Sequence, residues 1–487
     1  MTFRESTPRP WLAGVVALCV LLAIANEMPH LADDAWQDEA ATLMVFAAHG
    51  VSHAFTDYSM PNNHMLFSAA LSLWWSQGDS IVHARLLPAL MWLISTALFI
   101  VVGRRSLGWP ATAFGLALWT SSVLVAAFQL GLRGYAFSWP FTLLLFTACQ
   151  HFIVDGRRRA ALLVLGAGVA SLAILPTNAV VVAVCVSWAV LRDGIEHRAL
   201  RRAAVLRAAI AAILGLLGVL LYLPHRAELQ AHMHHGFSHW SGIEVITHWL
   251  LASSAPYWPL LPLLLFGTWI AWRAETLDAR RAGHSALALV ASLWGVMPLA
   301  VLLSPTPLVP RALVPLLPLW CLALGGLLAP GVINLASRDG RPMAPSLAMV
   351  AALCFALGHL VPACGGFDWR FPAGDDLCHQ YYRRPDYRPA ALLRAIDAHF
   401  GGEAVLVEPG TLWPLAFVQW NAGLHHALIR DIGQWPQGAA ATLPRLLVSE
   451  SRAAGLALLA RVTHAQPREL VEVLDSGVLK LYALRWD

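Results

Sequence analysis

Four carboxylates lie close together just after the first apolar segment, in the sequence Asp33-Asp34-Ala35-Trp36-Gln37-Asp38-Glu39. Ionisable side chains beside a bilayer are costly and are therefore usually functional. A carboxylate there can accept a proton from a hydroxyl group, or it can hold a divalent metal ion. We predict that Asp38 and Glu39 are catalytic and that Asp33 and Asp34 are solvated. The alternative is that Asp38 and Glu39 only cap a helix over about 35–49.

A second set of polar residues stands at the edges of later apolar segments. An arginine at a leaflet edge can bind a phosphate while its stem lies along apolar chains. His64 follows Asn62-Asn63 and precedes an apolar run, which slightly favours a ligand role over a backbone contact. The arginines could instead only snorkel to phospholipid phosphates. The predicted substrate-binding residues are Asn63, His64, Arg85, Arg133, Tyr135 and Arg311.

Composition places these residues in a membrane protein. Of 487 residues, 58% are hydrophobic and only 13% are charged, with a mean hydropathy of +0.59. Such a chain is too apolar for a water-soluble fold, so we predict a polytopic α-helical membrane protein. The net charge of +4 is too small to indicate a polyanion-binding surface, so nucleic acid is not an expected partner.

Arginine distribution predicts the orientation of the spans. Arginine clusters, such as Arg157-Arg158-Arg159, fall in alternate loops, which the positive-inside rule makes cytoplasmic. The N-terminus is then cytoplasmic, and the C-terminus is periplasmic or extracellular, in a protein of the cytoplasmic (inner) membrane. The eleven predicted spans are 11–26, 82–102, 109–130, 135–154, 160–175, 178–191, 208–223, 256–272, 285–303, 312–330 and 344–362.

The apolar stretch Met65 to Trp75 would invert this topology if it crossed the membrane. With about eleven residues it is too short to span, so we predict an interfacial or re-entrant helix in the first outer loop.

The composition changes after residue 362, which predicts a transmembrane domain over 1–362 and an exported α/β domain over 363–487. Cys364 and Cys378 could form a disulfide in an oxidising compartment, and the other five cysteines are expected to be small apolar residues. The predicted helices are Pro389–His399, 412–421 and 452–463. The predicted strands are 404–407, 427–429, 470–474 and 478–484.

Six histidines lie within 225–248, at positions 225, 232, 234, 235, 239 and 248. Their spacing fits no standard zinc site, so we predict an outer loop that folds over the substrate. Nearby aromatic residues could stack on sugars, but an interfacial aromatic belt accounts better for them.

The order and sidedness of these motifs resemble the GT-C glycosyltransferases, in particular the protein O-mannosyltransferases and lipid A aminoarabinose transferases. The resemblance covers residues 1 to about 330. It rests on Asp38-Glu39, Asn62-Asn63-His64-Met65-Leu66, His83-Ala84-Arg85-Leu86-Leu87-Pro88, Gly131-Leu132-Arg133-Gly134-Tyr135 and Val309-Pro310-Arg311-Ala312-Leu313-Val314-Pro315.

The resemblance implies transfer of a sugar from a polyprenyl-phosphate donor to an envelope lipid, glycan or protein, with membrane lipids as further partners. Asp38 would be the base or metal-site acid, and the expected stereochemistry is inversion. No cofactor is certain, although a divalent metal could bind the acids. No nucleotide sugar is expected, because the sequence has no glycine-rich nucleotide signature. The alternatives are a lipid-linked saccharide flippase and a non-catalytic envelope assembly subunit.

Overall fold

The computed structural model describes residues 10–59, 63–234, 241–273, 277–303, 310–338, 353, 388–400, 403–407, 409–422, 428–430, 443–449, 451–463, 467–476 and 479–486. The chain divides into two units, which are described separately. The first contains Met1–Met28, Tyr58–Phe67 and Pro88–Cys378. The second contains Pro29–Asp57, Ser68–Leu87 and His379–Asp487.

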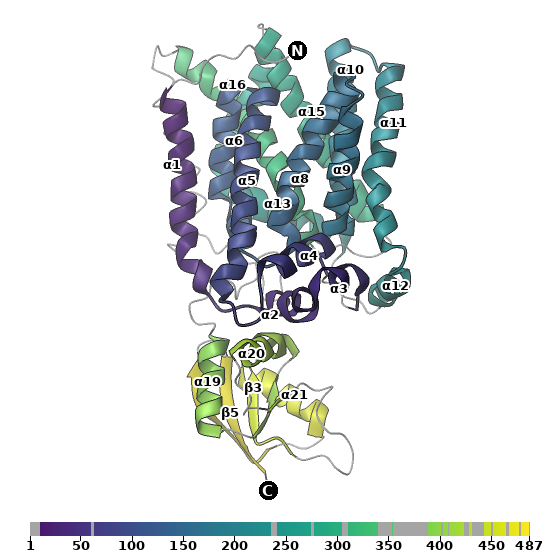
Figure 1. The fold of residues 1–487 in the computed structure, drawn as a ribbon. Coiled ribbons are helices and arrows are strands. Elements are labelled where there is room, and N and C mark those ends of the chain that lie inside the picture. Colours follow the sequence, from purple (N-terminus) through teal and green to yellow (C-terminus); the bar gives the residue numbers. More distant parts are fainter. Residues whose placement is uncertain are drawn as a thin grey trace. The chain divides into compact units, whose positions relative to one another are not determined.

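The first unit is a bundle of helices (Figure 1). In chain order, the long helices that contribute to it are α1 (Pro10–Glu27), α5 (Ile81–Leu107), α6 (Trp109–Ser121), α8 (Gly134–Cys149), α9 (Ala160–Ile174), α10 (Ala179–His197), α11 (Arg202–Leu216), α13 (Gly242–Ser254), α14 (Leu261–Arg273), α15 (Leu277–Leu303) and α16 (Leu317–Arg338). Two shorter helices are α7 (Val123–Phe128) and α12 (Arg226–His234).

Seven helical segments among the described residues are long and apolar enough to cross a membrane. Each overlaps a predicted span, whereas the eleventh predicted span, 344–362, lies outside the described residues except for residue 353. The other three predicted spans form shorter helices. The run 109–130 is divided at Ser122, where the extended backbone starts α7 and the side chain accepts a hydrogen bond from the Val125 amide.

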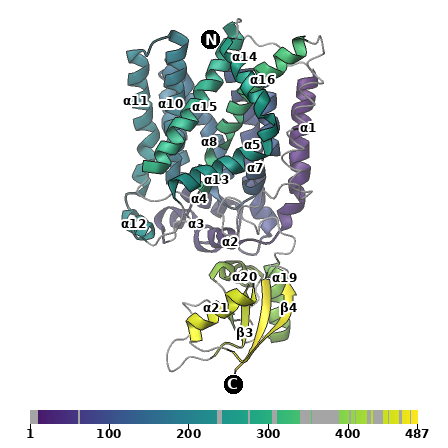
Figure 2. The same cartoon turned by 180° about the vertical axis from the view of Figure 1, so that it is seen from behind.

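Close helix packing in this bundle depends on small residues, because lipid provides no hydrophobic force to join apolar helices. A Cβ atom at Gly325 of α16 would lie 2.4 Å from the Ala111 carbonyl oxygen of α6. Glycine at position 325 therefore allows the backbones of α6 and α16 to meet. Helix α16 also packs against α14 and α15, and Figure 2 shows these three helices from behind.

The second unit contains short helices near the N-terminus, a five-stranded sheet and three helices that accompany the sheet. The N-terminal elements are α2 (Gln37–Ala41), a π-helical turn (Thr42–Phe46) and α3 (Gly50–Thr56). The helices of the C-terminal part are α19 (Pro389–Phe400), α20 (Pro409–Ala422) and α21 (Arg452–Thr463). The strands are β1 (Ala404–Val407), β2 (Leu428–Arg430), β3 (Leu446–Ser449), β4 (Glu469–Ser476) and β5 (Leu479–Arg485). Helix α4 (Met65–Trp74) matches the short helix predicted from the sequence.

The sheet has the order β2-β1-β3-β5-β4. Strands β2, β1 and β3 are parallel, and β5 pairs antiparallel with both β3 and β4. The sequence analysis missed β3, which is a central strand with all four residues buried. A strand buried on both faces is a short apolar run without alternation, so its pattern is weak.

The C-terminal part of the second unit is hydrogen-bonded to the chain segment that follows α4. The Gly78 amide donates to Asn421 Oδ1 (2.8 Å), and Gln77 Nε2 donates to the Trp420 carbonyl (3.2 Å). The Trp75 and Trp420 rings lie 5.9 Å apart. Residues 354–387 lie outside the described residues, so the domain boundary at 362/363 and the Cys364–Cys378 disulfide stay predictions.

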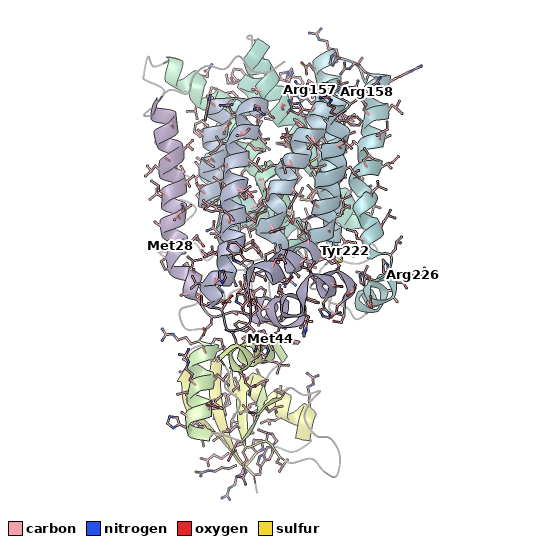
Figure 3. All side chains as sticks on the ribbon, viewed as in Figure 1. Met28, Met44, Arg157, Arg158, Tyr222 and Arg226 are labelled. Carbon is pink, nitrogen blue, oxygen red and sulfur yellow. The ribbon has the colours of Figure 1, made fainter. Side chains whose placement is uncertain are left out.

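Figure 3 shows Arg157 and Arg158 at one end of the first unit's bundle and Tyr222 and Arg226 at the other end. Single-cysteine variants at exposed positions of these two ends, Arg158→Cys and Gln230→Cys, should therefore react with an impermeant thiol reagent from opposite sides of the membrane. The wild-type protein is the control for its native cysteines. Labelling of both variants from one side would contradict the predicted topology.

Candidate active site

Glu39 and Arg85 form a buried ion pair in the second unit. Arg85 Nη2 lies 2.9 Å from Glu39 Oε2, and both side chains are fully inaccessible to solvent. Glu39, the third residue of α2, also accepts a hydrogen bond from the backbone amide of the N-cap residue Trp36 (3.4 Å). The pair connects residues that are 46 positions apart.

The same guanidinium holds the loop that leads to α2. Arg85 Nη1 donates to the carbonyl oxygens of His30 and Leu31, both at 3.2 Å, and to that of Asp33. Nη2 donates to the Asp34 carbonyl at 3.3 Å. Four backbone carbonyls that point inward are thus satisfied by one cation. These contacts support a structural role for Arg85, and the phosphate contact predicted for it stays a prediction.

Asp38 differs from its neighbour Glu39 in being only half-buried. It lies in the first turn of α2, and its carbonyl oxygen accepts a hydrogen bond from Thr42 Oγ1 (2.8 Å). A π-helical turn over Thr42–Phe46 follows, and such turns are frequent at functional sites. Of the two predicted catalytic acids, Asp38 is therefore the one that is partly exposed as a residue, although its Oδ2 atom is buried.

Asp34 has a role that the sequence analysis missed. Its carboxylate accepts a hydrogen bond from the Ala390 amide (3.1 Å) in the first turn of α19. Burial raises the pKa of Asp34, opposed by this hydrogen bond and by the charges of Arg394 and Arg85. Asp33, whose side chain is 37% exposed, pairs with His30 Nδ1 at 2.8 Å. The prediction that both acids are solvated is thus wrong for Asp34.

His64 and Arg133 meet in the interior of the first unit. Arg133 Nε donates to His64 Nε2 (3.1 Å), and the two residues are 3% and 1% exposed. Because Nε2 accepts this bond, the imidazole proton is placed on Nδ1 and the ring is neutral. The hydrogen bond from Arg133 Nε to His64 therefore fixes the orientation of the buried Arg133 guanidinium.

Tyr135 and Asn63 lie in the same region. Arg133 stands over the Tyr135 ring at 5.7 Å, and the His64 and Tyr135 rings are 5.3 Å apart. Asn63 is 1% exposed. The structure thus brings together His64, Arg133 and Tyr135, which are three of the residues predicted to bind substrate. We call these three residues the His64 cluster.

The start of α8 approaches the His64 cluster so closely that only glycine fits at position 134. A Cβ atom there would lie 2.4 Å from Ile174 Cγ2 and 2.6 Å from His64 Nδ1. Tyr58 is also buried in this unit, and burial raises its pKa while the positive charge of Arg133 lowers it.

Arg311 lies on a 3₁₀ segment, Pro310–Leu316, that is bonded to α8. Trp139 Nε1 donates to the Val314 carbonyl (3.1 Å), and Thr142 Oγ1 donates to the Pro315 carbonyl (3.2 Å). Arg311 itself is half-buried. One helix, α8, therefore carries Arg133 at its start and holds the segment that carries Arg311.

The histidine-rich segment is described only in part. His225 is 5% exposed and its Nδ1 lies 3.2 Å from Glu228 Oε2. Residues 235–240 lie outside the described residues, so the predicted covering loop stays a prediction. Within the part of the chain that the structure describes, no group of three or more His, Cys, Asp or Glu side chains is arranged to hold a metal ion.

The fold is similar to that of solved membrane enzymes. ArnT from Cupriavidus metallidurans in the apo state matches 97% of this chain and 98% of its own, with a TM-score of 0.53 and 15% identity. ArnT bound to undecaprenyl phosphate matches 96% of this chain and 98% of its own, with a TM-score of 0.52 and 15% identity. Arabinosyltransferase EmbB from Mycobacterium smegmatis, with 13% identity, reaches a TM-score of only 0.42 over 75% of this chain and 39% of its own.

No family model matches the sequence, and no curated protein is detectably similar to it. At 15% identity, the likeness to ArnT shows the fold alone. It confirms, at the level of fold, the resemblance to GT-C proteins that the sequence predicted. Together with the seven apolar helices, it makes the chain a multi-pass membrane protein.

Removing either member of the buried Glu39–Arg85 pair should destabilise the protein, because the remaining charge would be buried without its partner. The expected loss is roughly 3–5 kcal/mol for Glu39→Ala and at least as much for Arg85→Met, which also abandons four carbonyls. Thermal unfolding in detergent measures it, with the exposed Arg226→Met as control. Midpoints equal to that of the control would contradict the structural role.

Gly134→Ala should displace His64 and lower stability by roughly 1–3 kcal/mol, because the added methyl group overlaps the imidazole and Ile174. Gly166→Ala is the matched control, since a Cβ there meets nothing within 4 Å and alanine favours a helix. Thermal unfolding compares the two. Equal midpoints would show that α8 can move away from His64 at no cost.

Proposed function

We propose that the protein is a membrane glycosyltransferase that moves a sugar from a polyprenyl-phosphate donor to an envelope acceptor, at the outer face of the cytoplasmic membrane. The fold supports this, since ArnT, which it resembles over nearly the whole chain, has been solved with undecaprenyl phosphate bound. The observation that carries the proposal is the loop fixed by Arg85, which presents Asp38 half-exposed beside a buried Glu39.

In this proposal, Asp38 takes the proton from an acceptor hydroxyl. The oxygen then attacks the anomeric carbon as the bond from that carbon to the donor phosphate breaks, and the configuration inverts. The lipid phosphate leaves with its negative charge, so no acid has to protonate it. Fixed cations assist by stabilising the charge that develops on its oxygens.

Arg133 and Arg311 are the residues that we propose for the donor phosphate. Arg133 is oriented through Nε by His64, and its planar guanidinium carries further donors on its terminal nitrogens. Both arginines are connected to α8, because Arg133 directly precedes it and the segment of Arg311 is hydrogen-bonded to it. Cations that are already in place require little reorganisation during the reaction.

In this proposal, Asp38 is the base, whereas Glu39 has a structural role. Its buried pairing with Arg85 keeps α2 and the preceding loop in place, so it would act through the position of Asp38. The prediction that Glu39 itself reacts with the substrate is untested.

A flippase for a lipid-linked saccharide would also use cations and aromatic residues, and it remains the second candidate. It would have no need of a proton acceptor. Loss of Asp38 therefore separates the two functions, because transport should survive the loss and sugar transfer should not.

Asp38→Asn should lower turnover on the order of 100- to 10,000-fold, since a general base acts in the transition state. The apparent affinity for the donor should change little. Asp33→Asn is the control, because it removes a carboxylate from the same loop that pairs locally with His30. Normal turnover by purified Asp38→Asn protein would exclude Asp38 from the mechanism.

Arg133→Gln and Arg311→Gln should weaken use of the donor, because each loses a charge-assisted contact worth roughly 1.5–3 kcal/mol. Lysine should restore only part of the effect, since it lacks the planar fork. Donor titrations measure the change against the exposed Arg226→Gln. If both variants matched this control, the arginines would be membrane anchors and not donor ligands.

A further inference from the structure

A polar pocket lies at the end of the first unit's bundle that carries Arg157, where α5 and α8 end. Figure 3 shows this end opposite to Tyr222 and Arg226. The pocket is small, with a volume of about 40 Å³, which suits a single small group and not a whole drug-sized ligand. Its polar lining includes Arg105, Gln150, His151, Asp155 and Arg157. The proposed transfer reaction makes no use of these residues.

The pocket forms where α8 passes into a π-helical turn, Gln150–Val154. Turns of this kind are rare and recur at functional sites. Ser106 Oγ of α5 donates to Gln150 Oε1 (2.9 Å), which joins the two helices. Because the amide oxygen is used by Ser106, the amide nitrogen of Gln150 is the group that can donate to a ligand.

The charges around the pocket leave an excess of positive charge. The single carboxylate in the lining, Asp155, lies 2.8 Å from His151 Nδ1 and 3.9 Å from Arg157 Nε. Arg105 is exposed, and no ion pair involves it among the described residues. The lining thus contains two guanidinium groups and one carboxylate, and this excess of positive charge favours an anionic ligand.

The apolar side of the pocket indicates what carries the anion. Val101 and Thr147 line it beneath the arginines. One helical face of α5 continues from Arg105 through Val101 to Ile94, with Val101 39% and Ile94 40% exposed. On α8, Leu144 is 40% exposed and lies three residues before Thr147. Exposed apolar faces that lead to cations match an acyl chain below a charged head group.

We infer that this pocket binds the phosphate of an anionic phospholipid, with Arg105, Arg157 and the Gln150 amide as donors to its oxygens. The site is distinct from the proposed donor site and goes beyond the proposed function. Anionic lipids are preferred to zwitterionic ones here, because a choline cation would meet the arginines. The bound lipid would fasten α5 to α8 where the regular helix is interrupted.

The test is native mass spectrometry of the purified full-length protein with dioleoylphosphatidylglycerol, and with dioleoylphosphatidylcholine for comparison. The double variant Arg105→Gln/Arg157→Gln should bind the anionic lipid roughly tenfold more weakly than wild type. Arg104→Gln/Arg158→Gln is the matched control, since it removes the same charge from adjacent positions outside the lining. It should bind as wild type does.

A second variant fills the pocket without changing its charge. Thr147→Phe should also weaken binding of phosphatidylglycerol, with the thermal midpoint confirming that the variant is folded. Equal losses in the pocket and control arginine pairs would overturn the inference in favour of a diffuse charge effect. Displacement of the lipid by inorganic phosphate or glycerol 3-phosphate at matched concentration would overturn it in favour of a soluble phosphate ligand.

Discussion

The rest of the second unit depends on one buried cation. Arg85 has no access to solvent, and a guanidinium in such a place is tolerated only when a carboxylate and further acceptors surround it. Glu39 supplies the charge, and four carbonyls between His30 and Asp34 supply the acceptors. These hydrogen bonds hold the loop against the Arg85 guanidinium, and α2 begins where the loop ends. The position of Asp38 follows from that start.

The first unit also contains a buried arginine, but the side chain that orients this arginine is a histidine. At the N-terminus of α8, the cation is Arg133, whose Nε donates to His64 Nε2. This hydrogen bond orients the guanidinium in the interior of the unit. Gly134 permits the approach, since any side chain there would displace His64. Arginines of similar appearance in the sequence thus have different physical roles.

Local patterns made much of this architecture predictable, and long-range pairing accounts for what they missed. Strand β1, helix α19 and the β4–β5 hairpin follow from apolar alternation and turn residues, and α4 follows from its length. Strand β3 was missed because a fully buried strand does not alternate. Glu39 and Arg85 each stood out in the sequence, but nothing local indicated that they meet. Asp34 caps a helix 356 residues away, so its burial could not be predicted.

The proposed function is the transfer of a sugar from a polyprenyl-phosphate donor to an envelope acceptor. The most direct test mixes the purified wild-type protein with a polyprenyl-phosphate-linked sugar and envelope membranes, and follows the release of free polyprenyl phosphate by mass spectrometry. The account predicts release over time that requires the acceptor membranes and is matched by sugar gained in them. Transmembrane movement of an intact donor, with no polyprenyl phosphate released, would contradict the account and would favour a flippase.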